Sequence, residues 1–170
     1  MSNDKTPLTD PQTFTYEGVF DPDYVYSAMK DFLEQSKNYD GSEKKVEEKR
    51  IGGELHMECD FDADMHMTDH IHFKIETEFK MSGKDALVVD RNGAEHPCIE
   101  GIAEMKICSF IIINDNNHRH KNFFVEFFSK VYDKYFNTSE MGMLSKKARK
   151  DVSETITRFK QLTNMGSQRD

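Results

Sequence analysis

The segment Glu54–Met81 reads ELHMECDFDADMHMTDHIHFKIETEFKM and alternates polar with apolar residues. Its odd-numbered positions are apolar except Asp69 and Thr77, and none of its even-numbered positions is apolar. A period of two indicates extended chain with one buried and one solvated face. The segment therefore predicts the centre of a β-sheet. Its polar face carries four of the seven histidines, namely His56, His66, His70 and His72.

This segment is too long to be one strand, because at about 3.3 Å per residue it would exceed ~90 Å. It must turn back, and both halves keep the same parity, so the loop must contain an odd number of residues. We place the centre of the loop at Thr68, beside Asp69. This register faces residues of the polar side in pairs across the two strands. The predicted pairs are His66 with His70, Asp64 with His72, and Asp62 with Lys74.

Further elements are expected on both sides of this segment. Asp21-Pro22 is typical of a helix start, and Gly52-Gly53 is typical of a two-residue hairpin turn. Turns are also predicted at residues 82–85 and at Arg91-Asn92-Gly93. The expected strands are 13–20, 43–51 (charged, and so placed at a sheet edge), 86–90 and 98–113. The expected helices run from Pro22 to about residue 40, over residues 123–136, and from Leu144 to Leu162.

These elements predict an α+β fold. We expect a curved antiparallel meander sheet of about six strands, with one short N-terminal helix and a long C-terminal helix packed across it. Of the 170 residues, 1–12 are too polar to bury apolar surface and are expected to form a flexible tail. Residues 13–165 are expected to form a single domain, and residues 166–170 a second tail.

This element order resembles the helix-grip fold of START-like proteins, the SRPBCC superfamily, over about residues 13–163. That family usually has two short helices after its first strand, whereas only one is predicted here. The resemblance implies a cavity under the C-terminal helix that could bind an apolar small molecule. In that case Phe123 and Phe127 of the helical segment and Met57 and Met105 of the sheet are the expected ligand-binding residues.

Composition excludes several classes of function. The formal net charge of −8 argues against a nucleic-acid binder, which needs a basic face to displace counterions. The chain has no apolar run long enough for a membrane span and no signal peptide, so we expect a cytoplasmic protein. Its three cysteines show no Cys-x-x-Cys spacing, which argues against a disulfide framework or a zinc knuckle.

The predicted register gathers a candidate metal site near one hairpin end. It consists of His66, His70, His72 and Asp64. Such a group could bind zinc or nickel, or change its charge between about pH 5 and 7. The alternative is a solvated sheet face that is rich in histidine and acid and binds no ligand.

The sequence His70-x-His72-x3-Glu76-x6-Gly83 resembles the first metal motif of the cupin barrels. Two histidines that alternate on a strand point the same way, and a carboxylate further along can complete a metal site. Asp64 stands where the cupin motif opens with glycine, and no second motif follows. The resemblance implies a metal-dependent enzyme only if the polar face lines a barrel.

No phosphate-binding loop or nucleophile motif occurs in the chain. We therefore expect no catalysis and no cofactor. The first functional hypothesis is a non-enzymatic structural or protein-interaction subunit of a larger assembly, such as a viral or other particle made in the cytoplasm, with other protein subunits as partners. The alternatives are a helix-grip binder of an apolar small molecule and a cupin-like metal enzyme.

Overall fold

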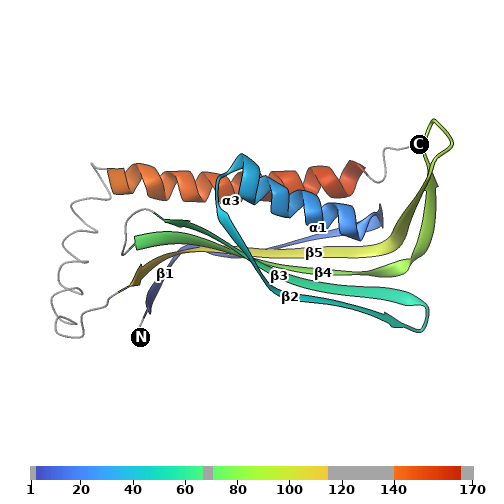
Figure 1. Ribbon diagram of the computed structural model, residues 1–170, viewed down its shortest axis with the longest axis horizontal. Coiled ribbons are helices and arrows are strands. Elements are labelled where there is room, and N and C mark those ends of the chain that lie inside the picture. The colour runs from blue at the N-terminus through green and yellow to red at the C-terminus, as the bar shows by residue number, and fades with distance from the viewer. Residues whose placement is uncertain (1–2, 67–70, 115–139, 166–170) are drawn as a thin grey trace.

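The computed structural model describes residues 3–66, 71–114 and 140–165 (Figure 1). Its five strands form one antiparallel sheet in the order β1-β5-β4-β3-β2. The described elements are β1 (Asn3–Phe20), α1 (Pro22–Asp31), the π-helical turn η1 (Phe32–Ser36), β2 (Asp40–Ile51), β3 (Glu54–His66), β4 (Ile71–Val89), β5 (Glu95–Asn114) and α3 (Glu140–Met165). The predicted α+β class is confirmed, with five strands instead of about six.

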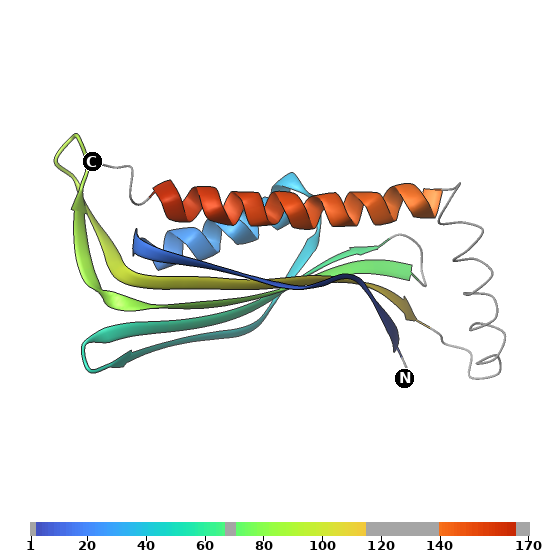
Figure 2. The same ribbon diagram turned by 180° about the vertical axis from the view of Figure 1, so that it is seen from behind.

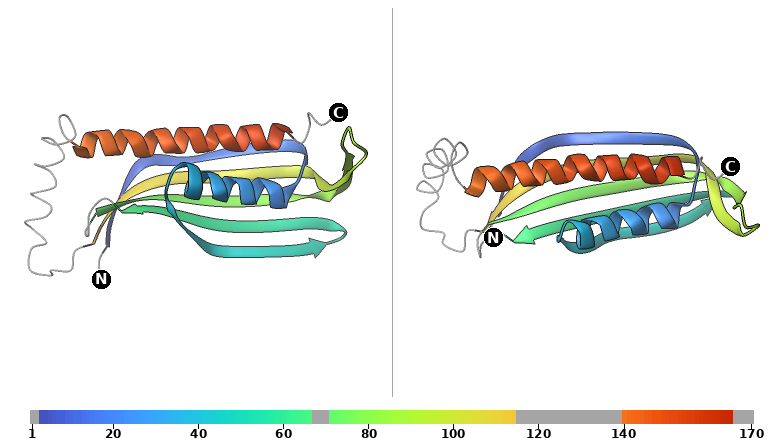
Figure 3. Two further views of the ribbon diagram at one scale, coloured as in Figure 1. Left: turned by 45° about the horizontal axis from the view of Figure 1, so that its top comes forward. Right: turned by 90° about the horizontal axis from the view of Figure 1, so that it is seen from above.

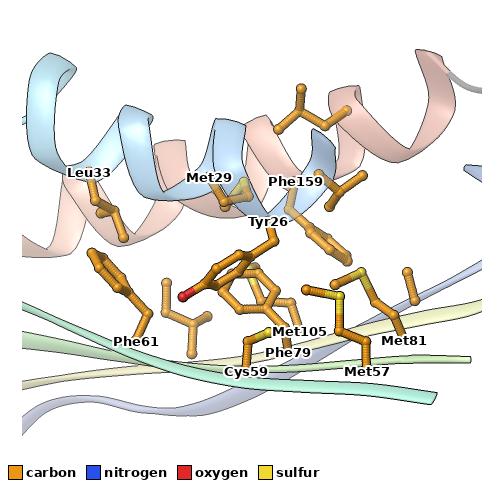
Figure 4. Close-up of a cluster of buried hydrophobic side chains, with 14 of the residues drawn as sticks. Tyr26, Met29, Leu33, Met57, Cys59, Phe61, Phe79, Met81, Met105 and Phe159 are labelled. Atoms are coloured by element: carbon orange, nitrogen blue, oxygen red, sulfur yellow. The ribbon is translucent and has the colours of Figure 1, made fainter. Parts of the chain in front are cut away.

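Both described helices lie on one face of the curved sheet (Figures 1 and 2). The long helix α3 runs above β1 and β5, and α1 lies beside it above β3 and β5 (Figure 3). The hydrophobic core fills the layer between sheet and helices (Figure 4). The opposite face of the sheet therefore carries the polar residues of the alternating strands.

The alternating segment folds as its pattern predicts. Within residues 54–81, odd-numbered side chains of β3 and β4 point toward the helices, and Met65 among them is only partly buried. The buried ones are Leu55, Met57, Cys59, Phe61, Ala63, Phe73, Ile75, Thr77, Phe79 and Met81. Thr77 tolerates the apolar layer because its hydroxyl donates a hydrogen bond of 2.8 Å to the Phe61 carbonyl. Asp69, the other exception, lies outside the described residues.

The chain turns at several predicted positions. The Asp21 carboxylate accepts a hydrogen bond from the Tyr24 N–H at 3.0 Å and caps α1. Gly52 and Gly53 have φ angles of 61° and 85°, as a two-residue hairpin with the twist of its strands requires. The helical segment ends before the predicted residue 40, because Asn38 adopts the left-handed conformation (φ 58°).

Three expectations about the strands are wrong. Residues 82–85 are not a turn, and residues 86–90 are not a separate strand, because β4 pairs with β5 continuously from Ile71 to Val89. Residues 3–12 are not a tail, because β1 begins at Asn3 and pairs along β5. Leu8 anchors this part of β1 in a small cluster with Phe73, Ile111 and Ala148. The expected tail at 166–170 lies outside the described residues.

The register of β3 and β4 differs from the prediction by two residues. His66 pairs with His72, so the pairing is symmetrical about position 69 and not about Thr68. Polar residues still face polar residues across the two strands, as the shared parity of both halves predicts. On the polar face, Asp64 now pairs with Lys74, and Asp62 with Glu76.

Candidate functional site

A row of ion pairs crosses the polar face of the sheet. The ammonium of Lys74 lies 2.7 Å from the Asp62 carboxylate and 3.7 Å from that of Glu76. Glu76 also binds Lys5 of β1, at 2.7 and 2.9 Å. Lys44 of β2 lies 4.0 Å from Asp62. The row therefore links β2, β3, β4 and β1 on the side away from the helices.

The centre of this row is shielded from solvent. The side chains of Asp62 and Lys74 are only 12% and 18% exposed. Burial by itself lowers the pKa of Lys74, but the hydrogen bond to Asp62 and the neighbouring carboxylates outweigh it, and the pKa of Lys74 is raised. The lysine therefore stays charged and holds the carboxylates in place, which is a structural arrangement and not that of a proton donor.

Only part of the predicted metal cluster is brought together. The rings of His66 and His72 lie with their centroids 5.3 Å apart, and His72 Nε2 is 3.7 Å from the Asp64 carboxylate. His70 lies outside the described residues. Among the residues that are described, no group of three or more His, Cys, Asp or Glu side chains is arranged to hold a metal ion. The metal site stays a prediction.

His72 is nevertheless in an unusual environment. Burial lowers the pKa of its ring, and this outweighs the opposite effect of Asp64, while His66 and Lys74 lower the pKa further. The ring is therefore less easily protonated than a free histidine. The polar face carries a half-buried neutral imidazole at the end of its ion-pair row.

The cupin-like motif does not form a ligand set in the described part of the chain. Glu76 would have to point a free carboxylate at the metal, but it is bound by Lys5 and Lys74. Gly83 lies within β4 and faces Gly101 of β5. The described strands form an open sheet in which β1 and β2 are opposite edges, whereas a cupin site needs a barrel interior.

Two of the predicted apolar ligand residues lie in the core. Met57 is 5% exposed and Met105 is fully buried, and both pack between the sheet and the helices (Figure 4). Phe123 and Phe127 lie outside the described residues. The core around the two methionines also contains Tyr26, Phe79 and Phe159, and the Phe79 ring lies 5.7 Å from that of Tyr26.

A buried polar cluster, which no sequence motif indicated, lies beneath α3 around Asp151. Asp151 is 3% exposed and accepts hydrogen bonds from the Tyr39 hydroxyl at 3.0 Å and from Lys147 at 2.7 Å. Lys37 lies 3.6 Å from the same carboxylate and also binds Glu154. Burial first and Asp151 second raise the pKa of Tyr39 far above its usual range. The cluster fastens α3 to the segment that leads into β2.

β4 and β5 extend beyond the rest of the sheet as a two-stranded arm. The sequence did not predict this arm, because the turn expected at residues 82–85 would have ended the strand there. β3 begins at Glu54, opposite Lys84, so β4 continues past it with β5 as its partner. Leu87 and Val89 carry the apolar parity of β4 into this arm, where they are 68% and 54% exposed. Figure 1 shows the arm bending toward the side of the helices. The apolar stripe of the core thus continues into solvent.

Comparisons with known proteins assign no family to this chain. No protein-family model matches it, and no curated protein matches it. A solved structure of a protein of unknown function from Staphylococcus aureus aligns over 98% of both chains, with 10% identity and a TM-score of 0.25. A likeness this weak says nothing about fold or function. Within the described residues, no helix is long and apolar enough to cross a membrane.

Proposed function

We propose that this chain is a non-enzymatic structural or protein-interaction subunit of a larger assembly. The observation that carries the proposal is the arm at residues 85–98, with the exposed side chains of Leu87 and Val89 on one face. A two-stranded ribbon is marginally stable in water, and exposed apolar patches mark interaction sites. A partner that covers the two side chains removes them from water and stabilises the arm.

The chemistry of the described side chains supports the same proposal. Burial raises the pKa of the Cys59 thiol to about 11, and burial with the nearby Glu76 carboxylate raises that of Cys108. Thiols of this kind are poor nucleophiles because they stay protonated at neutral pH. On the polar face, the ammonium of Lys74 and the carboxylate of Asp62 neutralise each other at 2.7 Å, so neither group is free to act on a substrate.

The test uses the tagged full chain in extracts of its own source. We expect the wild-type chain to elute from size exclusion in a complex larger than its own mass, and Leu87→Ser/Val89→Ser to shift toward the free chain. Val88→Ser is the matched control, since its side chain points to the opposite face of the arm. The proposal fails if the wild-type chain elutes free, or if the double variant elutes with the wild type while melting at the same temperature.

A second candidate, binding of an apolar small molecule under the helices, is favoured by the methionines of the core. Met29, Met57, Met81 and Met105 are all buried between the helices and the sheet (Figure 4). Methionine is flexible and polarisable, so such a core can repack around a guest. Native mass spectrometry of the chain from its own source tests this. A co-purified apolar mass supports binding, and an unliganded chain contradicts it.

A further inference from the structure

We infer that the free edge of β2 pairs with the same edge of a second copy of this chain, joining two sheets across a twofold axis at Val46. The inference rests on the interaction function proposed above and names one partner for it. The edge is separate from the arm that carries Leu87 and Val89, so the two surfaces can be tested independently.

The edge of β2 is open in the described part of the chain. β2 stands last in the sheet order and pairs there with β3 alone (Figure 3). Val46 is 53% exposed, although it lies on the core-facing side opposite the fully buried Cys59. Unpaired N–H and C=O groups along such an edge are a template for another strand. The exposed valine marks the apolar centre of the edge.

The charges of β2 are arranged with opposite signs about Val46. Positions at equal distance from this residue carry a lysine on one side and a glutamate on the other. The pairs are Lys45 with Glu47, Lys44 with Glu48, and Glu43 with Lys49. In an antiparallel pair related by a twofold axis, residues equidistant from the axis stand opposite each other. Two copies of β2 centred on Val46 therefore bring Lys45 to Glu47 on both sides of the axis, which is the pair that lies in regular strand.

The charges of β2 favour this pairing over the adjacent one centred on Glu47. Lys45 and Glu47 lie on the same polar face, because they stand opposite Asp60 and Glu58 of β3. A pairing centred on Val46 places these two side chains across from each other twice. A pairing centred on Glu47 instead brings two glutamates together and faces Lys45 with Lys49. Like charges directly opposite each other are unfavourable.

The joined edge is short. A register shift between Glu43 and Lys45 interrupts the regular pairing with β3. About the axis at Val46, the symmetrical pairing is therefore regular from Lys45 to Glu47, and the outer pairs lie at the irregularity. A ribbon of this length buries less than the roughly 1,200–2,000 Å² of a stable complex. The dimer is therefore weak and depends on protein concentration, and salt weakens it further by screening its ion pairs.

Sedimentation velocity of the purified full chain tests the inference by charge reversal. The wild-type chain should dimerise as its concentration rises. Lys45→Glu and Glu47→Lys, each alone, face like charges across the axis and should remain monomeric. An equimolar mixture of these two variants restores both opposite pairs and should dimerise again. Lys80→Glu is the control, because it reverses a charge on the same face of β4 away from the edge, and it should dimerise like the wild type.

A monomeric wild-type chain at every concentration overturns the inference, and so do single variants that dimerise as well as their mixture does. Lys45 also binds Glu58, so melting temperatures must show that the variants are folded. Val46→Arg is the second variant, because it puts two cations at the axis and leaves that ion pair intact. A chain that is monomeric when purified but elutes in a larger complex from extracts refutes this inference and leaves the proposed function standing.

Discussion

Alternate residues of the same two strands, β3 and β4, form the two faces of the central sheet, and the surroundings of these faces differ. Between residues 54 and 81, most odd-numbered side chains pack under the two helices and are buried, whereas several even-numbered ones form ion pairs with each other. Each large apolar side chain that is buried adds about 1.5–3 kcal/mol to the free energy of unfolding, whereas most exposed ion pairs add little. The apolar face therefore stabilises the fold, and the polar face contributes much less to its stability.

The largest expected loss of stability comes from a substitution on the apolar face, which the helices cover. Phe79→Ala removes a ring that is 1% exposed and contacts the rings of Tyr26 and Phe159. We expect the free energy of unfolding in urea to fall by about 3–5 kcal/mol. Lys80→Ala, at the next residue, should change it little, because that side chain is on the polar face and more than half exposed. Similar losses from the two variants would show that the faces are not distinct.

Removal of a polar group that is buried on the helix-covered side should lower the free energy of unfolding more than removal of one on the polar face. Asp151→Ala leaves the buried Tyr39 hydroxyl without its acceptor and removes the partner of Lys147. We expect a loss of about 2–3 kcal/mol in the same urea experiment. In a double-mutant cycle, Tyr39→Phe should cost less in the Asp151→Ala background than in the wild type. Additive effects would mean that the two side chains do not act together.

On the polar face, a substitution at the shielded centre of the ion-pair row should lower the free energy of unfolding more than a substitution at its exposed end. Lys74→Met leaves the 12% exposed Asp62 carboxylate with the more distant Lys44, and we expect a loss of about 1 kcal/mol. Lys5→Met removes a partner from Glu76 where both side chains are more exposed, and should cost about 0.5 kcal/mol or less. Equal losses in urea unfolding would mean that the shielding of the centre has no energetic weight.

The smallest expected effect is a dependence of stability on pH. Burial lowers the pKa of His72 from its ordinary value of 6.5, so the unfolded chain binds this proton more tightly than the folded one. The contribution of the neutral His72 ring to the free energy of unfolding is complete above pH 6.5, and it is lost as the pH falls below this value. His72→Gln should therefore flatten the decline in unfolding free energy on acidification, and His56→Gln serves as the control. An unchanged slope would assign the decline to other groups.

Much of the fold was predictable because it depends on local patterns. The parity of residues 54–81, the Asp21 cap and the Gly52-Gly53 turn follow from side-chain direction and backbone freedom, which a short window of sequence contains. The polar face with its histidines was also predictable. The register was wrong by two residues, because parity restricts a loop to odd lengths without choosing among them.

Features that depend on a distant partner were not predictable. Gly83 indicated a turn, but in the sheet it faces Gly101, where a Cβ atom would overlap the backbone of Ser82. The glycines permit a close approach of strands and not a reversal of the chain. The burial of Asp151 could not be predicted either, because it depends on Tyr39, more than a hundred residues earlier.

The sequence by itself determined which residues of the central strands face the core and that β2 is a charged edge strand, because alternation and local charge can be recognised without knowing the partner strand. Only the tertiary structure decided that residues 3–12 form a strand and that β4 extends into an arm. Both depend on the long strand β5, whose backbone groups satisfy their hydrogen bonds and whose Ile111 helps to bury Leu8. A polar segment folds here because a distant strand pairs with it.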